Sequence, residues 1–512
     1  MTTGSVEHRA AKVSLVTGAS TILSIVLQLL SVPVCLHFWG KQGYGAWLAI
    51  FAAATLMRTV DGGYITYAGN RLNLLYHQDR QEMRRVLAAG SLGLVALGIL
   101  QLALLGLLIL FDGLGWLLGD SALAGSSNAR VALIVLVVSW VLSGSYIGLV
   151  HRLMVPAGLL YQSAWWSMAF QAIVFLAIML AAALRFDLLA TSILVAGIQA
   201  GIYIASADYL RRKLPAFFPW WHAPTWRLAA TDLRGSLTFT FSGFMQQATT
   251  NGMVLLVSGV LGAAMVPAFT TVRTLANLWT NVTTTLTSPL LPDMVRLHAN
   301  HQPAKLLILA KAHAWLLGTL VNLGILVSLP LLAWAYGLWT HGELELDTRL
   351  LAGLLAGILL ANAGSFMTTY LGGINHVRAV LAIAMLRGLV SLIVAWLLLP
   401  KIGLAAAGVG IMGAEALCFM ALAGHYFPQA LRHVGSSEAS FATSGWSMAG
   451  LLATLALIGT SAVLGHIPII PLLLAMALVI TSSWQGWKLL DVEVRQRLCV
   501  LGARIVFFDR AG

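Results

Sequence analysis

Long apolar runs alternate with short polar connections along the chain. Fourteen of these runs approach the ~20 residues that a helix needs to cross a bilayer. They lie near residues 13–36, 45–68, 87–111, 130–150, 162–184, 188–208, 236–259, 264–290, 307–335, 350–371, 379–399, 404–424, 446–465 and 468–485. Stretches such as Val131–Val150 lack the period-two alternation of barrel strands, which excludes a transmembrane β-barrel. The pattern predicts an all-α, polytopic membrane protein with about 14 transmembrane helices.

Composition agrees with a membrane chain and narrows its partners. Hydrophobic side chains make up 59% of the sequence, charged ones only 9%, and mean hydropathy is +0.86, whereas soluble proteins carry ~25% charged residues. The net charge of +12 indicates Lys and Arg kept on the cytoplasmic side rather than a nucleic-acid partner. Cys35, Cys418 and Cys499 stand far apart, so neither a disulfide framework nor a thiolate metal site is indicated. No Walker-type phosphate loop is present, which argues against ATP hydrolysis by this chain. We expect no cofactor, no bound metal and no enzymatic activity.

Lys and Arg are distributed unevenly between the two sets of connections. Of the 30 cations, 22 lie in the N-terminus, the connections on its side of the membrane and the C-terminal tail, whereas five lie in the opposite loops. Because positive charge is retained inside, both termini are predicted to be cytoplasmic. The other three cations, Arg58, Arg273 and Arg387, lie within predicted spans.

A weak internal repeat divides the chain into parts. Three short matches recur in the same order: Ser14-Leu15 as Ser236-Leu237 and Gly40 as Gly262, both at an offset of 222, and Tyr146-Ile147-Gly148 as Tyr370-Leu371-Gly372, at 224. They indicate a duplicated six-helix unit, related by a pseudo-twofold axis along the membrane normal, which is an architecture of transporters. The predicted parts are an N-terminal six-helix bundle (1–208), a cytoplasmic linker on the membrane surface (209–235), a C-terminal six-helix bundle (236–424), a cytoplasmic loop with two further helices (425–485) and a cytoplasmic tail (486–512).

Several glycine and proline patterns resemble a known family. They are Phe38-Trp39-Gly40-Lys41-Gln42-Gly43-Tyr44-Gly45-Ala46-Trp47, Asp61-Gly62-Gly63, Leu261-Gly262 leading to Pro289–Arg296, and Gly372-Gly373-Ile374-Asn375-His376 leading to Leu399-Pro400-Lys401-Ile402-Gly403. Over roughly residues 10–424 the chain is similar to polysaccharide flippases, including the O-antigen type, of the multidrug/oligosaccharidyl-lipid/polysaccharide exporter (MOP) superfamily.

The resemblance implies a fold, a substrate and a location. The fold would be a V of two six-helix lobes, like that of multidrug exporters of the MATE type. The substrate would be a polyprenyl-diphosphate-linked oligosaccharide, moved from the cytoplasmic to the periplasmic leaflet of the bacterial inner membrane in O-antigen, lipopolysaccharide or exopolysaccharide biosynthesis. Implied partners are membrane lipids and other proteins of glycan assembly. Family members hold the diphosphate with cationic residues, a role that falls here to cations within spans.

Four charged residues form two candidate pairs inside predicted spans. Arg58 and Asp61 are spaced i,i+3 on one helix face. Arg387 and Glu415 lie at nearly the same depth on consecutive antiparallel spans. Because an intramembrane charge is costly, each pair is either a structural ion pair or part of a functional site. If a proton gradient drives transport, Asp61 and Glu415 are the candidate carriers.

A polar stripe begins at Arg273, which has no acidic residue on its own span. It continues with Asn277, Asn281 and Thr284 at helical spacing. The preceding span is also polar, and we predict a cavity lined by both spans; polar packing between helices is the alternative. Amides suit sugar hydroxyls, and a guanidinium can fork onto phosphate oxygens. The candidate substrate-binding residues are Arg273, Asn277, Asn281, Arg58, Arg387, Gln246, Gln247 and Asn251, with no catalytic residue.

These patterns favour a flippase that works by alternating access between the two bundles. A cation-coupled multidrug exporter of the same superfamily is the nearest alternative, although such an exporter favours an acidic, aromatic cavity. A glycan polymerase or ligase would need a large periplasmic loop, which the short connections do not provide. A structural subunit would need neither the polar stripes nor the repeat.

Overall fold

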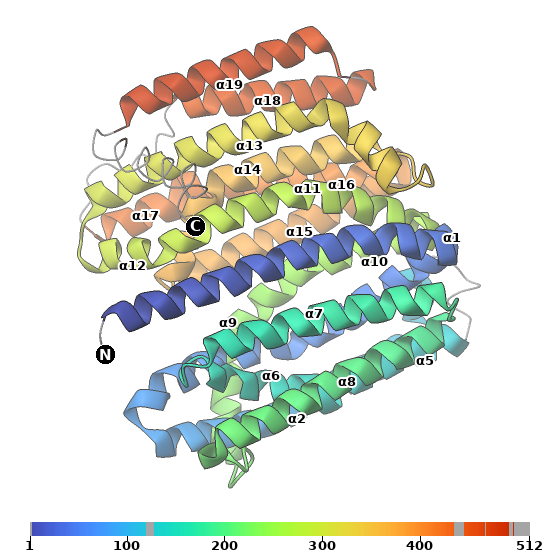
Figure 1. The fold of residues 1–512 in the computed structure, drawn as a ribbon, viewed down its shortest axis with the longest axis vertical. Coiled ribbons are helices and arrows are strands. Elements are labelled where there is room, and N and C mark those ends of the chain that lie inside the picture. The colour runs from blue at the N-terminus through green and yellow to red at the C-terminus, as the bar shows by residue number, and fades with distance from the viewer. Residues whose placement is uncertain (1–2, 119–126, 435–444, 466, 491–494, 496–512) are drawn as a thin grey trace, which may run out of the picture. The chain divides into compact units, whose positions relative to one another are not determined.

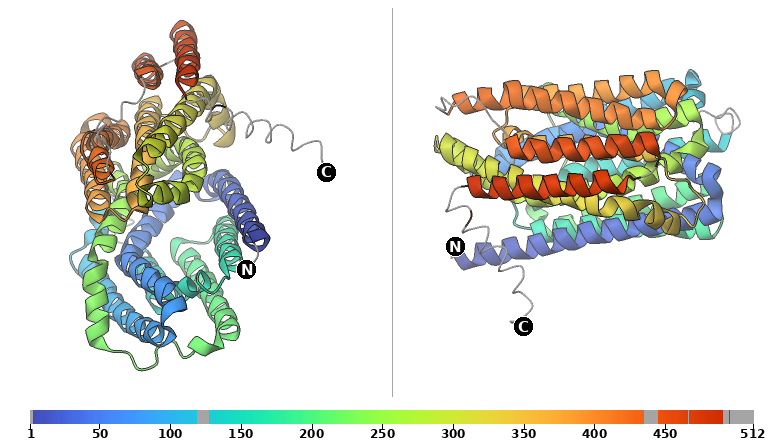
Figure 2. Two further views of the ribbon diagram at one scale, coloured as in Figure 1. Left: turned by 90° about the vertical axis from the view of Figure 1, so that its left-hand side faces the viewer. Right: turned by 90° about the horizontal axis from the view of Figure 1, so that it is seen from above.

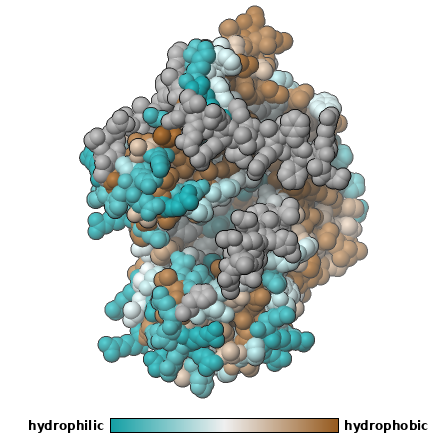
Figure 3. Space-filling model, turned by 60° about the vertical axis from the view of Figure 1, so that its left-hand side comes forward, coloured by the Kyte–Doolittle hydropathy of each residue, from teal (hydrophilic) through white to brown (hydrophobic). Residues whose placement is uncertain are grey.

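The computed structural model describes residues 3–118, 127–434, 445–465, 467–490 and 495, and no strand occurs among them. The predicted all-α class is therefore confirmed. Most of the predicted tail (486–512) lies outside the described residues. The helices run side by side within each compact part of the chain (Figures 1 and 2). On the face shown in Figure 3, hydrophobic residues gather mainly on the right side of the view and hydrophilic residues mainly on the left.

The chain forms two compact units, each described separately. Unit 1 comprises Met1–Thr271 and Leu338–Glu345, and unit 2 comprises Val272–Gly337 and Leu346–Gly512. The α-helices of unit 1 are α1 (Thr3–Gln78), α2 (Arg80–Leu110), α3 (Gly113–Leu118), α5 (Ser127–Ser139), α6 (Ser145–His151), α7 (Leu160–Ala183), α8 (Leu188–Lys213), α9 (Trp226–Gln247) and α10 (Met253–Leu261). The helices that follow are α11 (Val266–Thr287), α12 (Leu291–Ala299), α13 (Pro303–Trp339), α14 (Thr348–Gly373), α15 (Val377–Ile402), α16 (Ala405–Ala421), α17 (Phe427–Arg432), α18 (Gly445–Leu464) and α19 (Ile469–Leu489).

The unit boundary falls inside α11, later in the chain than the predicted start of the C-terminal bundle at residue 236. The difference lies in α9 and α10, which pack along α1 in unit 1. Three π-helical turns interrupt the long helices: η1 (Trp140–Gly144), η4 (Ala248–Gly252) and η7 (Leu422–Tyr426). Such bulges re-aim side chains and are frequent at functional sites.

Ten helices of the described structure are long and apolar enough to cross a membrane. The other predicted spans are also helical. The long helix α1 counts once among the ten but holds two predicted spans, because Gly40 breaks it with φ 66°. Helices α9 and α11 are more polar, α10 is apolar but only 9 residues long, and Met448–Leu464 of α18 is a shorter apolar helix.

Two glycines at equivalent places support the internal repeat. Gly40 and Gly262, which match at the repeat offset, both adopt positive φ, 66° and 89°. Each lies between the first two spans of its predicted bundle. Glycine populates this left-handed region without the steric cost that a side chain would meet. The shared conformation agrees with a duplicated unit.

Trp339, the last residue of α13, contacts α1 within unit 1. The indole Nε1 of Trp339 donates a hydrogen bond to the carbonyl oxygen of Leu29 at 2.6 Å. That carbonyl lies four residues before Pro33, which has no N–H to donate to it. Trp339 therefore supplies the donor that the proline removes.

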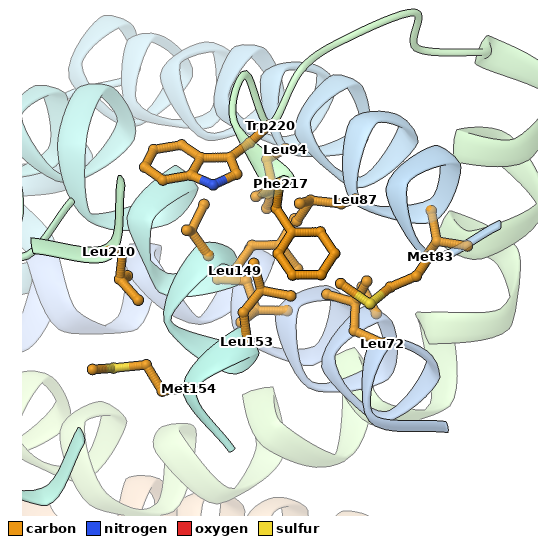
Figure 4. Close-up of a cluster of buried hydrophobic side chains, with 14 of the residues drawn as sticks. Leu72, Met83, Leu87, Leu94, Leu149, Leu153, Met154, Leu210, Phe217 and Trp220 are labelled. Carbon is orange, nitrogen blue, oxygen red and sulfur yellow. The ribbon is translucent and has the colours of Figure 1, made fainter. Parts of the chain in front are cut away.

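The predicted surface linker is only partly on the surface. Phe217 and Trp220 are buried, at 6% and 5% exposure, in a cluster with Met83, Leu149 and Leu153 (Figure 4). Their neighbours Phe218 and Trp221 are exposed. Part of the predicted linker therefore belongs to the hydrophobic core of unit 1.

Candidate functional site

A buried polar cluster in unit 1 surrounds Arg58 and Asp61 of α1. The π-helix η1 places the Trp140 ring beside both residues. Its Nε1 donates a hydrogen bond to Asp61 Oδ2 at 3.0 Å, and the Arg58 guanidinium carbon lies 5.3 Å from its ring centroid. Such a cation–π contact stabilises a cation in a desolvated site. Trp140 therefore connects the acid and the base.

The direct Arg58–Asp61 ion pair considered from their spacing is not present in the described structure. Arg58 Nη2 instead donates to Gln199 Oε1 at 3.0 Å and lies 3.3 Å from the carbonyl oxygen of Leu136. Helices α5 and α8 thus hold the guanidinium, while Asp61 is turned towards Trp140. Spacing places two side chains on one face of a helix, but their partners on neighbouring helices decide where each one points.

The second oxygen of Asp61 faces two more polar side chains. Gln101 of α2 and Ser145 of α6 lie beside the carboxylate, but their geometry does not form a hydrogen bond with it. Asp61 and Gln101 are both 0% exposed and Ser145 is 2% exposed. An unpaired buried polar group costs about 1–3 kcal/mol, so three together need a physical explanation.

Unit 2 contains the second pair, and here the predicted contact is confirmed. Arg387 of α15 approaches Glu415 of α16 twice: Nε lies 2.6 Å from Oε1, and Nη2 donates to Oε2 at 3.0 Å. Glu415 is buried, at 8% exposure. Helices α15 and α16 approach closely near the pair, because a Cβ added to Gly410 of α16 would lie 2.5 Å from the carbonyl oxygen of Ser391 on α15. The pair therefore lies within tight helix packing.

Helix α11 presents two polar faces with different surroundings. On one face, Thr283 donates to Asn362 Oδ1 at 3.0 Å, and Thr287 Oγ1 lies 2.9 Å from His313 Nε2. On the other face, the predicted stripe is open: Asn277 and Thr284 are exposed, and Asn281 and Arg273 are half-buried. Hydrogen bonds to Asn362 of α14 and His313 of α13 account for the first face, whereas Asn277 and Thr284 leave exposed polar groups on the second.

Helix α9 and the π-helix η4 carry the other amide candidates, in unit 1. Gln247 Oε1 accepts a hydrogen bond from Asn251 Nδ2 at 2.7 Å and another from Thr250 Oγ1 at 3.2 Å. Gln246 is exposed. The structure thus joins Gln247 and Asn251 into one network and leaves Gln246 accessible. Substrate binding by these residues and by the α11 stripe stays a prediction.

Sequence reasoning missed Gln101, Trp140, Ser145 and Gln199. The signal was present, because Gln101 and Gln199 are isolated amides in otherwise apolar spans, and a polar group at membrane depth needs a partner. Within the described part of the chain, no group of three or more His, Cys, Asp or Glu side chains is arranged to hold a metal ion.

Comparison with known proteins relates the fold to transporters. No model of a known protein family matches the chain, and no curated protein sequence matches it. Among solved structures, the lipid II flippase MurJ in an inward closed conformation is similar with a TM-score of 0.65 at 13% identity, covering 93% of this chain and 99% of that one. An inward-facing multidrug resistance transporter of the MATE family in the MOP superfamily matches with 0.59 at 12% identity, covering 83% of this chain and 99% of that one.

A third structure, a MOP superfamily transporter from Pyrococcus furiosus, has a TM-score of 0.55 at 13% identity and covers 83% of this chain and 95% of that one. Identities this low establish a likeness of fold. The chain is therefore an all-helical, multi-pass membrane protein with the fold of these transporters.

Proposed function

We propose that this chain moves a polyprenyl-diphosphate-linked oligosaccharide from the cytoplasmic to the periplasmic leaflet by alternating access. The open stripe on α11 carries the proposal, because exposed amide and hydroxyl groups along a helix of a membrane fold need water or a polar ligand. The similarity in fold to a lipid II flippase supports a substrate of the lipid-linked class.

The residues divide between the two ends of such a substrate. Arg273 heads the stripe and is the leading group for the diphosphate, because a guanidinium forks onto phosphate oxygens. Arg58 is a second cation for this role, since its contacts in unit 1 are to neutral groups. Arg387 is the weakest of the three, because Glu415 already neutralises it.

The amides suit the glycan, whose hydroxyls both donate and accept hydrogen bonds. Asn277 and Asn281 offer such groups on α11, and Gln246 does so on α9. Gln247 and Asn251 already bond to each other, so a sugar would exchange with that network.

We further propose that the protein lies in a bacterial inner membrane with both termini in the cytoplasm. The charge asymmetry of its connections supports this orientation. Single cysteines at Arg212 and Lys305 should react only with reagents on the cytoplasmic side, and cysteines at Gly43 and Glu345 only with reagents outside. If a cysteine at position 212 reacts with a reagent applied outside, the orientation is opposite to the proposed one.

Depletion of the protein in its own cells tests the transport function. A lipid-linked glycan should accumulate on the cytoplasmic leaflet, and mass spectrometry of the extracted lipid identifies both the glycan and its diphosphate linkage. Restoring the chain should clear the accumulated lipid. Normal glycan export without the protein would reject the proposal.

A multidrug exporter is the second candidate, favoured by the fold similarity to the MATE transporter. It predicts that depletion raises intracellular accumulation of cationic dyes while lipid-linked glycans stay at their normal level. Measuring dye and lipid in the same depleted cells separates the two functions.

A further inference from the structure

The buried polar atoms around Asp61 have no role in the substrate contacts proposed above. Asp61 Oδ1, Ser145 Oγ and both amide atoms of Gln101 lack hydrogen-bond partners, although all three residues are buried. They come from α1, α6 and α2, so three separate helices bring them to one place inside unit 1. Native structures rarely leave such groups unpaired, and an unpaired set often marks a functional site.

The chemistry of these groups fits a carboxyl that changes its charge. A hydroxyl and a primary amide can each donate or accept a hydrogen bond. Toward an ionised Asp61, Gln101 would donate through Nε2 and Ser145 through its hydroxyl. Toward a protonated Asp61, Gln101 would accept the new O–H through Oε1. Small rotations of two side chains thus serve both charge states of Oδ1.

The opposite oxygen of Asp61 has a partner of fixed character. Trp140 Nε1 can only donate, and it bonds to Oδ2. A hydrogen bond to an ionised oxygen is roughly twice as strong as one to a neutral oxygen. The hydrogen bond from Trp140 to Asp61 is therefore stronger when the carboxyl is ionised. It can persist, in a weaker form, when the carboxyl is protonated.

Two other charged or titratable groups face this cluster. Arg58 of α1 and Tyr203 of α8 both interact electrostatically with Asp61. The Tyr203 ring lies 5.9 Å from the Trp140 ring, edge to face. Helix α2, the π-helix η1 and α6 contribute the neutral groups of Gln101, Trp140 and Ser145. Arg58 is thus a cation that interacts with Asp61 across this cluster.

We propose that Asp61, Gln101 and Ser145 form a binding site for one proton, and that Trp140 transmits the charge of Asp61 to Arg58. A proton released by hydronium or a buffer acid leaves that donor and forms one O–H bond on Oδ1, which removes one negative charge from Asp61. Arg58 then loses the attraction of the carboxylate and becomes more available to an anion. This part rests on the proposed function, in which Arg58 contacts the substrate diphosphate. Proton binding and anion binding therefore favour each other, and the linkage is reciprocal.

Infrared difference spectroscopy of the purified full-length protein tests the site without any substrate. Acidification should produce the C=O stretching band of a protonated carboxylic acid. Asp61→Asn should remove this band, whereas the double variant Arg387→Met with Glu415→Gln should keep it. Gln101→Leu should shift the frequency of the band and the pH at which it appears, because the acid loses one hydrogen-bonding partner. This variant keeps the test possible if Asp61→Asn does not fold.

An unchanged band in Asp61→Asn would overturn the proton site, as would an unshifted titration in Gln101→Leu. The titration is repeated with Na⁺ replaced by a large organic cation. If Na⁺ suppresses the band at constant pH, the site binds a metal cation and the proton assignment is wrong.

The relay through Trp140 has its own readout. Pyrophosphate serves as the anionic probe, and in the wild-type protein it should make the Asp61 band titrate about one pH unit higher, since it withdraws Arg58 from the carboxylate. Trp140→Phe keeps an aromatic ring but loses the donor, and should abolish most of that shift. A full shift in Trp140→Phe would reject the relay and leave the proton site intact. No shift in the wild-type protein would reject Arg58 as an anion-binding group.

The proton site and the flippase function can be rejected independently of each other. The band and its titration do not depend on which substrate the protein carries. A normal Asp61 band combined with unchanged lipid-linked glycans in depleted cells would reject the flippase and retain the proton site.

Discussion

Asp61 in unit 1 and Glu415 in unit 2 are both buried acids on apolar helices, yet their surroundings differ. Both carboxylate oxygens of Glu415 contact the guanidinium of Arg387: Oε1 lies 2.6 Å from Nε, and Oε2 lies 3.0 Å from Nη2. Asp61 receives one hydrogen bond from a neutral indole, and its nearest cation, Arg58, is held by Gln199 and by the Trp140 ring. Each unit thus stabilises a carboxylate away from water, unit 2 with a guanidinium and unit 1 with a neutral indole.

The surroundings of Glu415 suit only the ionised carboxylate, whereas those of Asp61 suit both the ionised and the protonated form. A guanidinium has donors only, so protonating Glu415 would leave Arg387 both uncompensated and short of acceptors. The geometry of the pair therefore suits a carboxylate that faces a guanidinium. The hydroxyl and amide beside Asp61 can reverse their roles. Of the two proton carriers considered from the sequence, the surroundings favour Asp61, and they give Glu415 a structural role.

The largest expected effect tests the structural side of this comparison. Arg387→Met should destabilise the protein by about 3–5 kcal/mol, because it leaves a buried carboxylate uncompensated. Adding Glu415→Gln should recover much of the loss. Denaturant unfolding of the purified single and double variants measures the coupling. If the effects of the two substitutions simply add, the pair is not a unit and Glu415 becomes a candidate for function again.

The second prediction separates a functional cation of unit 2 from the structural one. Arg273→Ala should lower transport of the lipid-linked glycan about 10- to 100-fold, as expected for losing one charge-assisted hydrogen bond of about 1.5–3 kcal/mol. Arg273→Lys should recover part of the activity, since it keeps the charge but not the fork. The double variant Arg387→Met with Glu415→Gln should lower transport less than Arg273→Ala does, because Glu415 already neutralises Arg387.

Folding must be measured alongside transport in the Arg273 variants. If Arg273 instead neutralises an acid on another helix, stability and transport will fall together. A folded Arg273→Ala protein that transports at the normal rate would remove this residue from the mechanism and leave the polar side chains of α11 as its support.

The third prediction addresses the functional side of the comparison. Asp61→Asn should slow transport driven by a pH gradient by about tenfold or more, equivalent to about 1.4 kcal/mol. Its stability should change by less than about 1.5 kcal/mol, because an amide oxygen still accepts the bond from Trp140. Reconstituted vesicles with an imposed pH gradient measure the rate. A normal gradient-driven rate in this variant would show that Asp61 and Glu415 do not differ in function.

The smallest effect comes from a histidine outside the membrane. Partial burial of His298, together with the charges of His301 and His433, lowers its pKa. Its ring nitrogen Nδ1 lies 2.7 Å from the Tyr370 hydroxyl. Folding thus favours the neutral ring, so its contribution is present above the ordinary pKa of about 6.5 and is lost as pH falls below that value.

Acidification from pH 7.5 to 5.5 should therefore cost unit 2 less than about 1 kcal/mol through this residue, because solvent screens a partly exposed ring. His298→Gln should flatten the dependence of unfolding free energy on pH. An unchanged slope would assign the pH dependence to another group. The variant also removes the protonation of His298 from measurements of proton binding by Asp61.

Hydropathy alone was sufficient for the fold class. Apolar runs of bilayer length predict helices because a spanning segment must satisfy its own backbone hydrogen bonds. The positive φ of Gly40 and Gly262 agrees with the repeat that their spacing suggested. The Arg387–Glu415 contact also followed from sequence, since equal depth on consecutive antiparallel spans leaves few other partners for a buried charge.

Other features depended on distances between helices that no local pattern records. Arg58 and Asp61 share a helix face, but the indole of Trp140 enters from another helix and replaces their expected ion pair. Phe217 and Trp220 look like surface aromatics in sequence, and they are core residues because the unit 1 bundle leaves room for them.

The sequence by itself determined which side chains had to find a partner inside the membrane, because the cost of burying a polar group depends on its own chemistry and depth. Only the tertiary structure decided which partner each one found. That choice depends on how α1, α2, α6, α8 and the π-helical turn pack, and a shift of a few ångströms between helices makes or breaks a hydrogen bond. Gln101, Ser145 and Asp61 lie far apart along the chain, and helix packing alone makes them one site.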